Sequence, residues 1–258
     1  MKKRALFVSL LLTLPAFAAI TNVQSSAAWS CSGTGSSIVC SVTLTTQATA
    51  TNNLLAVWTF WQSGSTYTAS VQDSQLNGVN GFFPGAVGPT LQSASNTSGQ
   101  IFYAAKITGS GLGRDMVTVT FTCVSATLPL TCATSTITDA GVVAVEYSGA
   151  DIYYPLDSAS AGFSTTGNPT ALLDSGDVSP ANSNLVLFAG GVTDATTGLT
   201  AGSSFTGLQF AHGSSGSSVA EQMIVSGNNT LQRATACLGG ACPPPNGTTP
   251  GNWLMQMA

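Results

Sequence analysis

The chain has 258 residues, of which 43% are hydrophobic, 8% aromatic and only 6% charged. Its formal net charge is −4, and it becomes about −7 if the basic N-terminus is removed, because three cationic side chains then remain against ten acidic ones. Nucleic-acid binding needs a basic surface, so the composition excludes a nucleic-acid partner and disfavours anionic membranes. Solubility has to come from Ser, Thr, Asn, Gln and Gly, which is typical of exported all-β proteins.

The first 18 residues have the three parts of a signal peptide. A positive start (KKR) precedes an apolar run of about nine residues, and the segment ends in the small-x-small pattern AFA. The apolar run is far shorter than the roughly 20 residues that span a bilayer, which disfavours the alternative of an N-terminal anchor helix. We therefore expect residues 1–18 to be removed, no membrane insertion of residues 19–258, and a secreted, periplasmic or cell-surface location.

Residues 19–258 show strand patterns throughout and almost no helical periodicity. Clusters of Gly, Asn, Pro and Ser separate the candidate strands, which run in chain order through 37–46, 54–61, 101–108, 116–123, 142–149, 185–192, 219–227 and 231–237. Many short strands with such punctuation predict an all-β fold. We expect a single domain, a two-sheet antiparallel sandwich of jelly-roll or immunoglobulin-like character.

Four of these elements recur in the same order. TNNLLAVW resembles ANSNLVLF, IFYAAKIT resembles VAEQMIVS, MVTVTFTC resembles TLQRATAC, and GVVAVEYS resembles GNWLMQMA. In both copies a cysteine pair precedes the last strand. The pattern predicts two related halves, roughly residues 38–160 and 170–258, that share one core. Segments 62–100 and 189–218 are rich in Gly, Ser, Thr and Asn and are expected to carry the working loops.

The succession LLAVW, VQDS, IFYAAKI, VTVTF, VEYSGAD, PLDSASA, NSNLVLF, AGSSF and AEQMIVS resembles an uncharacterised β-sandwich module of exported bacterial proteins. The resemblance covers nearly all of residues 19–258. It implies the fold and export. The module has no established chemistry, so the resemblance assigns no catalytic residue.

The six cysteines form three closely spaced pairs. In an exported chain, close spacing around expected hairpins and loops favours three local disulfides. No C-x-x-C occurs and His212 is the only histidine, so zinc is disfavoured and no cofactor is expected. The expected bridges are Cys31 with Cys40, Cys123 with Cys132, and Cys237 with Cys242.

The chain contains only two glutamates, Glu146 and Glu221, each on an expected strand. Retaining glycosidases need two carboxyl groups about 5 to 5.5 Å apart, and small exported jelly-roll xylanases carry two such glutamates and a strand similar to VEY. The low aromatic content and the three-residue length of that likeness argue against catalysis. The repeat also pairs Glu146 with Gln256, which indicates a strand position that needs a long polar side chain.

Glu221 also has a structural interpretation. The sequence SGNN between VAEQMIV and LQRATAC is typical of a hairpin turn, and a hairpin there would bring Glu221 close to Arg233. We therefore expect a cross-strand ion pair between these two side chains.

Isolated aspartates in loops are candidates for calcium, which takes six to eight oxygen ligands. The better loops are VQDSQLNG and SGADIYYPLD, but neither has the spacing of a calcium-binding loop. Loop aspartates more often bond their own backbone in turns, and we favour that interpretation. The candidate ligands are Asp73, Asn77, Asp151 and Asp157.

Aromatic residues mark candidate binding surfaces. Trp58 and Phe60 are two positions apart, so they lie on the same side of an expected strand, and we interpret them as core residues. Two further clusters lie in loop-like sequence and are candidates for sugar stacking or protein contact. They are Phe82 with Phe83, and Tyr153 with Tyr154.

The leading functional interpretation is a non-enzymatic secreted or cell-surface module for adhesion or ligand binding, with a glycan or another surface protein as partner. The first alternative is a glycan-active hydrolase that uses Glu146 and Glu221. The second is a structural subunit of an extracellular assembly, in which the final strand WLMQMA permits strand exchange.

Overall fold

The computed structural model describes residues 19–63, 66–124, 132–165, 170–181, 185–212, 216–225, 230–244 and 246–258. The expected signal peptide, residues 1–18, lies outside the described residues. The described part contains one helical turn, η1 (Cys132–Thr134), and no helix that is long and apolar enough to cross a membrane.

The strands form four antiparallel sheets. The first inner sheet has the spatial order β1 (Thr21–Thr34), β8 (Thr136–Ser148), β3 (Leu54–Gln62), β6 (Thr97–Ala104) and β5 (Gly85–Gln92). The first outer sheet has β2 (Ser37–Leu44), β7 (Asp115–Cys123) and β4 (Tyr67–Asp73). The second inner sheet has β9 (Ser160–Phe163), β16 (Trp253–Met257), β11 (Leu185–Thr193), β14 (Ser217–Val225) and β13 (Thr206–His212). The second outer sheet has β10 (Leu172–Val178), β15 (Gln232–Leu238) and β12 (Leu199–Ala201).

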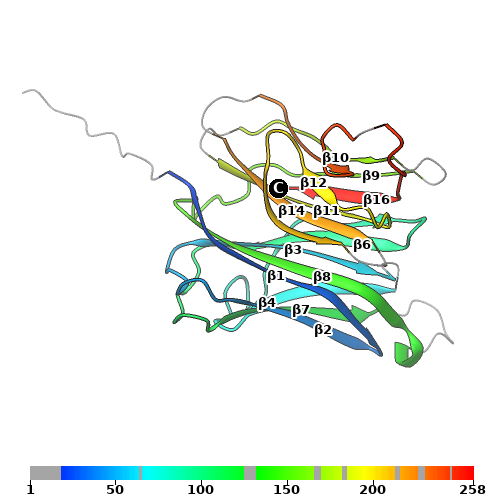
Figure 1. Ribbon diagram of the computed structural model, residues 1–258. Helices are drawn as coiled ribbons and strands as arrows, with labels where there is room; N and C mark the ends of the chain where they lie inside the picture. Colours follow the sequence, from blue (N-terminus) through cyan, green and yellow to red (C-terminus); the bar gives the residue numbers. More distant parts are fainter. Residues whose placement is uncertain are drawn as a thin grey trace, which may run out of the picture.

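The same strand order appears twice. Strands β1 to β8 build the first inner and outer sheets, and β9 to β16 build the second pair with each strand in the equivalent place. Figure 1 shows the strands in layers, with β2, β7 and β4 on one side of the molecule and β10 on the other. The predicted all-β antiparallel sandwich with two related halves is confirmed.

Three hydrophobic cores separate the four layers. The first core lies between the sheets of the first half, the second core lies between the sheets of the second half, and a central core joins the two inner sheets. The repeat predicted one core shared by the two halves. The halves do share the central core, but each half also has a core of its own. Because β3, β8 and β16 are covered on both faces, their sequences are nearly continuous apolar runs.

The contact between the two inner sheets is close because glycines face large side chains. The indole of Trp58 on β3 lies against Gly190 on β11, where an added methyl carbon would be 2.1 Å from Trp58 Cδ2. The arrangement is reciprocated on β6, where a methyl carbon added at Gly99 would be 2.6 Å from Leu254 Cδ1 on β16. Each half thus inserts a large side chain against a bare stretch of the other half's backbone.

All three expected disulfides are formed. Each links cysteines nine or fewer positions apart, and no described cysteine is free. The bridges join β1 to β2, the end of β7 to η1, and the end of β15 to the following turn, as Cys31–Cys40, Cys123–Cys132 and Cys237–Cys242.

Replacing Gly190 by alanine should destabilise the protein. The new methyl group would overlap the buried Trp58 indole, and overpacking of this kind costs about 1–3 kcal/mol. Urea denaturation followed by tryptophan fluorescence measures the loss. Gly198→Ala is the matched control, because an added methyl carbon there meets no heavy atom within 4 Å. Equal free energies of unfolding for the two variants would contradict the close contact between the inner sheets.

Candidate functional site

Glu146 is a buried acceptor of hydrogen bonds. Its side chain is fully buried near the end of β8. Oε1 accepts hydrogen bonds from the Ala50 backbone N–H (2.8 Å) and Asn53 Nδ2 (2.6 Å), and Oε2 accepts one from Gln24 Nε2 (2.6 Å). The Gln24 amide is itself held by both peptide groups of Gln47. Glu146 therefore ties β8 to β1 and to the segment that enters β3, and its own side chain lies in the interior and not on a solvent-exposed face.

The equivalence of Glu146 and Gln256 is wrong at the level of side chains, although their strands are equivalent. Alternate residues of a strand share a face. Glu146 lies on the same face of β8 as Ala144, which belongs to the first core, whereas Gln256 lies on the same face of β16 as Leu254, which belongs to the central core. Gln256 Nε2 donates across the inner-sheet contact to the Gly99 carbonyl (2.8 Å).

Glu221 is buried between the sheets of the second half. It lies two positions after Val219 on β14 and therefore on the same face, which belongs to the second core. Glu221 Oε2 accepts a hydrogen bond from the Gly202 backbone N–H (3.1 Å). Oε1 is buried without a hydrogen-bond partner among the described residues. Burial raises the pKa of Glu221 to about 8, and the Gly202 hydrogen bond only partly opposes this shift.

The expected ion pair between Glu221 and Arg233 is wrong. Strand β14 belongs to the second inner sheet and β15 to the second outer sheet, so the two strands do not form a hairpin. Arg233 instead binds Asp174 (3.0 Å) and Asp177 (2.7 Å) on β10, where its hydrogen bond lowers the pKa of Asp177. These are exposed pairs, and such pairs contribute little to stability.

The structure does not bring the two glutamates together. Glu146 points from β8 toward the first outer sheet, and Glu221 points from β14 toward the second outer sheet, with both inner sheets between them. The geometry of a retaining carboxylate pair is not formed by these residues.

The loop aspartates accept hydrogen bonds from backbone and amide groups, and they do not gather around a common point. Asp73 accepts hydrogen bonds from both the backbone N–H and the side-chain amide of Asn77. Asp151 accepts from the backbone of Tyr153, and Asp157 accepts from the Ala181 backbone N–H. Among the described residues, no group of three or more His, Cys, Asp or Glu side chains is placed to hold a metal ion.

Another buried acid, Asp115, was missed from the sequence. Asp115 opens β7 with 1% of its surface exposed. Burial, together with repulsion from Asp73 and Glu146, raises the pKa of Asp115 to about 6. Its position after Arg114 in a loop-like stretch carries no signal of burial, since the neighbouring acids come from distant parts of the chain.

The aromatic candidates separate into core and surface. Phe83 is 3% exposed and belongs to the first core, so its expected role in ligand contact is wrong for the folded protein. Phe82, beside it, is 45% exposed. Tyr153 and Tyr154 are highly exposed on the loop that follows β8, and Lys106 Nζ lies 5.8 Å from the centre of the Tyr153 ring.

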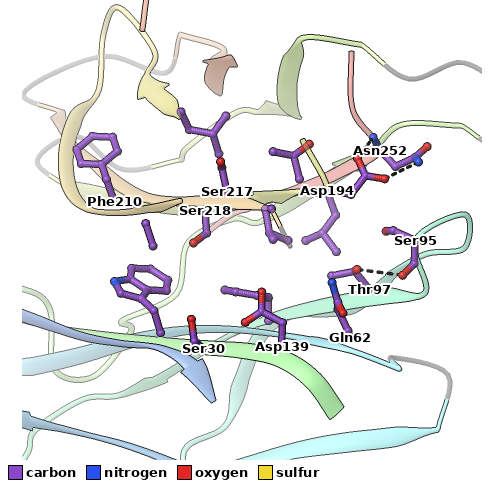
Figure 2. Close-up of a pocket in the computed structure, with 18 of the residues that line it drawn as sticks. Ser30, Gln62, Ser95, Thr97, Asp139, Asp194, Phe210, Ser217, Ser218 and Asn252 are labelled. Carbon is purple, nitrogen blue, oxygen red and sulfur yellow. Dashed lines mark hydrogen bonds between the residues drawn. The ribbon is translucent and has the colours of Figure 1, made fainter. Parts of the chain in front are cut away.

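A recess with polar walls opens at one end of the contact between the inner sheets. This seam cleft has a volume of about 420 Å³. Figure 2 shows Ser30 and Asp139 on the side of the first inner sheet and Ser218 pointing toward them from the second, while Phe210 and Ser217 line the cleft from the edge of the second inner sheet with their side chains pointing away from the first. Both halves are therefore needed to form it, and sequence reasoning could not assemble it from separate strands.

Aromatic packing fixes the floor of the seam cleft. Trp29, half-buried on β1, lies 6.3 Å from Phe60 between ring centres, and Phe60 lies 5.4 Å from Trp58 of the central core. Gly141 provides the space, since a methyl carbon added there would be 2.7 Å from Trp29 Cε3. The indole is thus held by rigid neighbours.

Polar groups with different roles line the walls. Asp194 accepts hydrogen bonds from both the backbone N–H and the side-chain amide of Asn252 (2.7 Å each). Thr97 donates to the Ser95 carbonyl (Figure 2). Hydroxyl, amide and carboxylate groups are therefore present with aromatic carbon, and the described lining contains no lysine, arginine or histidine.

Comparison with known proteins gave no relative. No protein-family model, no curated protein and no solved structure matches the chain. The resemblance to exported bacterial modules stays a prediction from the sequence.

Glu146→Gln should destabilise the fold. The new amide would place an NH₂ group against Gln24 Nε2, and Gln24 cannot rotate its amide without losing two hydrogen bonds to Gln47. Buried hydrogen bonds to charged groups are worth about 1.5–3 kcal/mol, so we expect a loss of about 2 kcal/mol in the free energy of unfolding at pH 7. Chemical denaturation measures it. Stability equal to that of the native protein would contradict the assigned network.

Glu221→Gln should instead flatten the pH dependence of stability. Between pH 4.5 and about 8, folded Glu221 keeps a proton that the unfolded chain has lost, so the free energy of unfolding falls as the pH rises through this window. The range from pH 6.5 to 8.5 lies above the pKa of Asp115, which is about 6. Over this range the free energy of unfolding of the native protein should fall by about 2 kcal/mol, and that of the variant should not show this fall. Parallel stability curves for the two proteins would show that Glu221 is not a protonated buried acid.

Proposed function

We propose that the protein is an exported, non-enzymatic binding module whose seam cleft takes a neutral glycan. The observation that carries the proposal is the pairing of aromatic carbon with hydroxyl, amide and carboxylate groups in one recess between the halves. Small-molecule sites are typically concave, with apolar walls and a few convergent polar groups. The seam cleft has this composition.

A sugar suits both kinds of surface in the cleft. The face of a pyranose ring presents C–H groups, which an aromatic face with its partial negative charge attracts. Trp29 offers such a face, and Phe210 lines the cleft from the edge strand β13. The hydroxyl groups around the ring edge both donate and accept hydrogen bonds, as do serine, threonine and amide side chains, while carboxylates accept. Because the described lining holds Asp139 and Asp194 and no cation, an anionic sugar is disfavoured.

Export is supported by the disulfides. Three bridges in one chain are typical of an oxidising compartment, and the proposed location is therefore secreted, periplasmic or at the cell surface. An assembly by exchange of the final strand has weaker support. Strand β16 is paired on both sides, by β11 and β9, and all five of its residues are buried.

Phe210→Ala should lower glycan affinity by about tenfold, which corresponds to about 1.4 kcal/mol and is of the order of an aromatic contact. A glycan array with purified protein identifies the ligand, and isothermal titration calorimetry then compares variants. Phe163→Ala is the matched control, because Phe163 and Phe210 are 48% and 50% exposed on opposite edges of the same sheet, and only Phe210 lines the cleft.

Two results would contradict the proposal. One is the absence of any glycan binding by the native protein. The other is an equal loss of affinity in Phe210→Ala and Phe163→Ala, which would place the binding surface elsewhere.

A further inference from the structure

A second cavity, larger than the seam cleft, lies where the inner-sheet contact meets the loop after β8. It has a volume of about 740 Å³, within the range of roughly 300–1,000 Å³ typical of small-molecule sites. Its walls come from the starts of β3 and β11 and the end of β6, and residues 149–158 lie along its mouth. We call it the loop cavity.

The walls of the loop cavity are mainly aliphatic and aromatic. Those that also belong to the central core are fixed in place by the packing of the two inner sheets, which makes this a preformed space. They include Leu54, Ile101, Tyr103, Val186 and Phe188. An occupant would gain roughly 25 cal/mol for each Å² of apolar surface removed from water.

Two hydroxyl groups in this apolar surround have no partner. Tyr147 is fully buried, and neither Tyr147 Oη nor Ser158 Oγ makes a hydrogen bond to any described residue. The Asn22 side chain is close enough to lower the pKa of Tyr147 against the rise that burial causes, but it forms no hydrogen bond of regular geometry with Oη, and its amide donates to Gln222 Oε1 (3.1 Å). A buried hydroxyl without a partner costs free energy, so both groups favour a ligand that can hydrogen-bond to them.

The charges at the mouth restrict the head group of that ligand. Asp151 and Asp157 are both exposed there, and Lys106 Nζ lies 5.8 Å from the centre of the Tyr153 ring beside them, so these side chains give the mouth two carboxylates and one ammonium. An anionic head group would meet a net negative charge. A quaternary ammonium would tolerate the carboxylates but could neither donate nor accept a hydrogen bond at the two hydroxyls.

We propose that the loop cavity is a second binding site, for a neutral amphipathic molecule with a single apolar chain and a hydroxyl head group. The site is independent of the seam cleft and does not rest on glycan binding. The aliphatic walls hold the chain, and Tyr147 Oη and Ser158 Oγ bind the head group.

Three probes with the same decyl chain test the head-group assignment. Isothermal titration calorimetry at pH 7.5 should rank 1-decanol above decyltrimethylammonium, and decyltrimethylammonium above decanoate, with each probe kept below its aggregation limit. Binding of 1-decanol should also show a negative heat-capacity change, the signature of apolar burial. Failure of all three probes to bind, or tightest binding of decanoate, would overturn the proposal.

Two variants then locate the site. Tyr147→Phe removes only the hydroxyl and should weaken 1-decanol binding about threefold to tenfold, with decyltrimethylammonium unaffected. Ala150→Trp adds an indole to the cavity wall and should weaken all probes by at least tenfold, whereas Ala133→Trp, on exposed η1, should bind like the native protein. Unchanged 1-decanol affinity in either Tyr147→Phe or Ala150→Trp would overturn the assignment. Phe210→Ala should bind 1-decanol with the affinity of the native protein. The proposals for the seam cleft and the loop cavity are therefore tested separately.

Discussion

The face-to-face contact between the two inner sheets is the constraint on which the rest of the structure depends. A sheet with one face in water alternates apolar and polar residues, but these sheets are covered on both faces. Each half therefore carries long apolar strands that would be exposed alone. Trp58 against Gly190, and Leu254 against Gly99, set how closely the halves approach, and a domain with so few charges depends on that burial to stay folded.

The same contact explains where the polar groups and the recesses lie. A strand buried on both faces has no solvent-exposed face for a carboxylate. Each glutamate carboxyl group therefore needs either hydrogen-bond donors or a proton in the interior. Glu146 has three hydrogen-bond donors, and Glu221 has one and keeps its proton near neutral pH. Both proposed sites lie along this contact, and both use residues from the two halves.

Predictions from the sequence were most accurate for features that depend on residues close together in the chain. Close cysteine spacing gave the correct bridges, and the ordered repeat gave two halves whose strands occupy equivalent places. They failed for features that depend on which sheet a strand joins. The turn signal before LQRATAC suggested a hairpin, but β15 crosses to the outer sheet, which separates Glu221 from Arg233. Because VVAVEYSG and WLMQMA are apolar at nearly every position, nothing in them shows which of the two strand faces points toward the outer sheet and which toward the central core. The mismatch of Glu146 and Gln256 follows from that missing alternation.

Native-state hydrogen exchange tests the central role of the inner-sheet contact most directly. If the halves stabilise each other through it, the most protected amides of β3 and β8 should open with the same free energy as those of β11 and β16, and that value should equal the global free energy of unfolding. Gly190→Ala should lower protection equally in all four strands. Two separate free energies, one for each half, with only β11 and β16 responding to the substitution, would contradict the account.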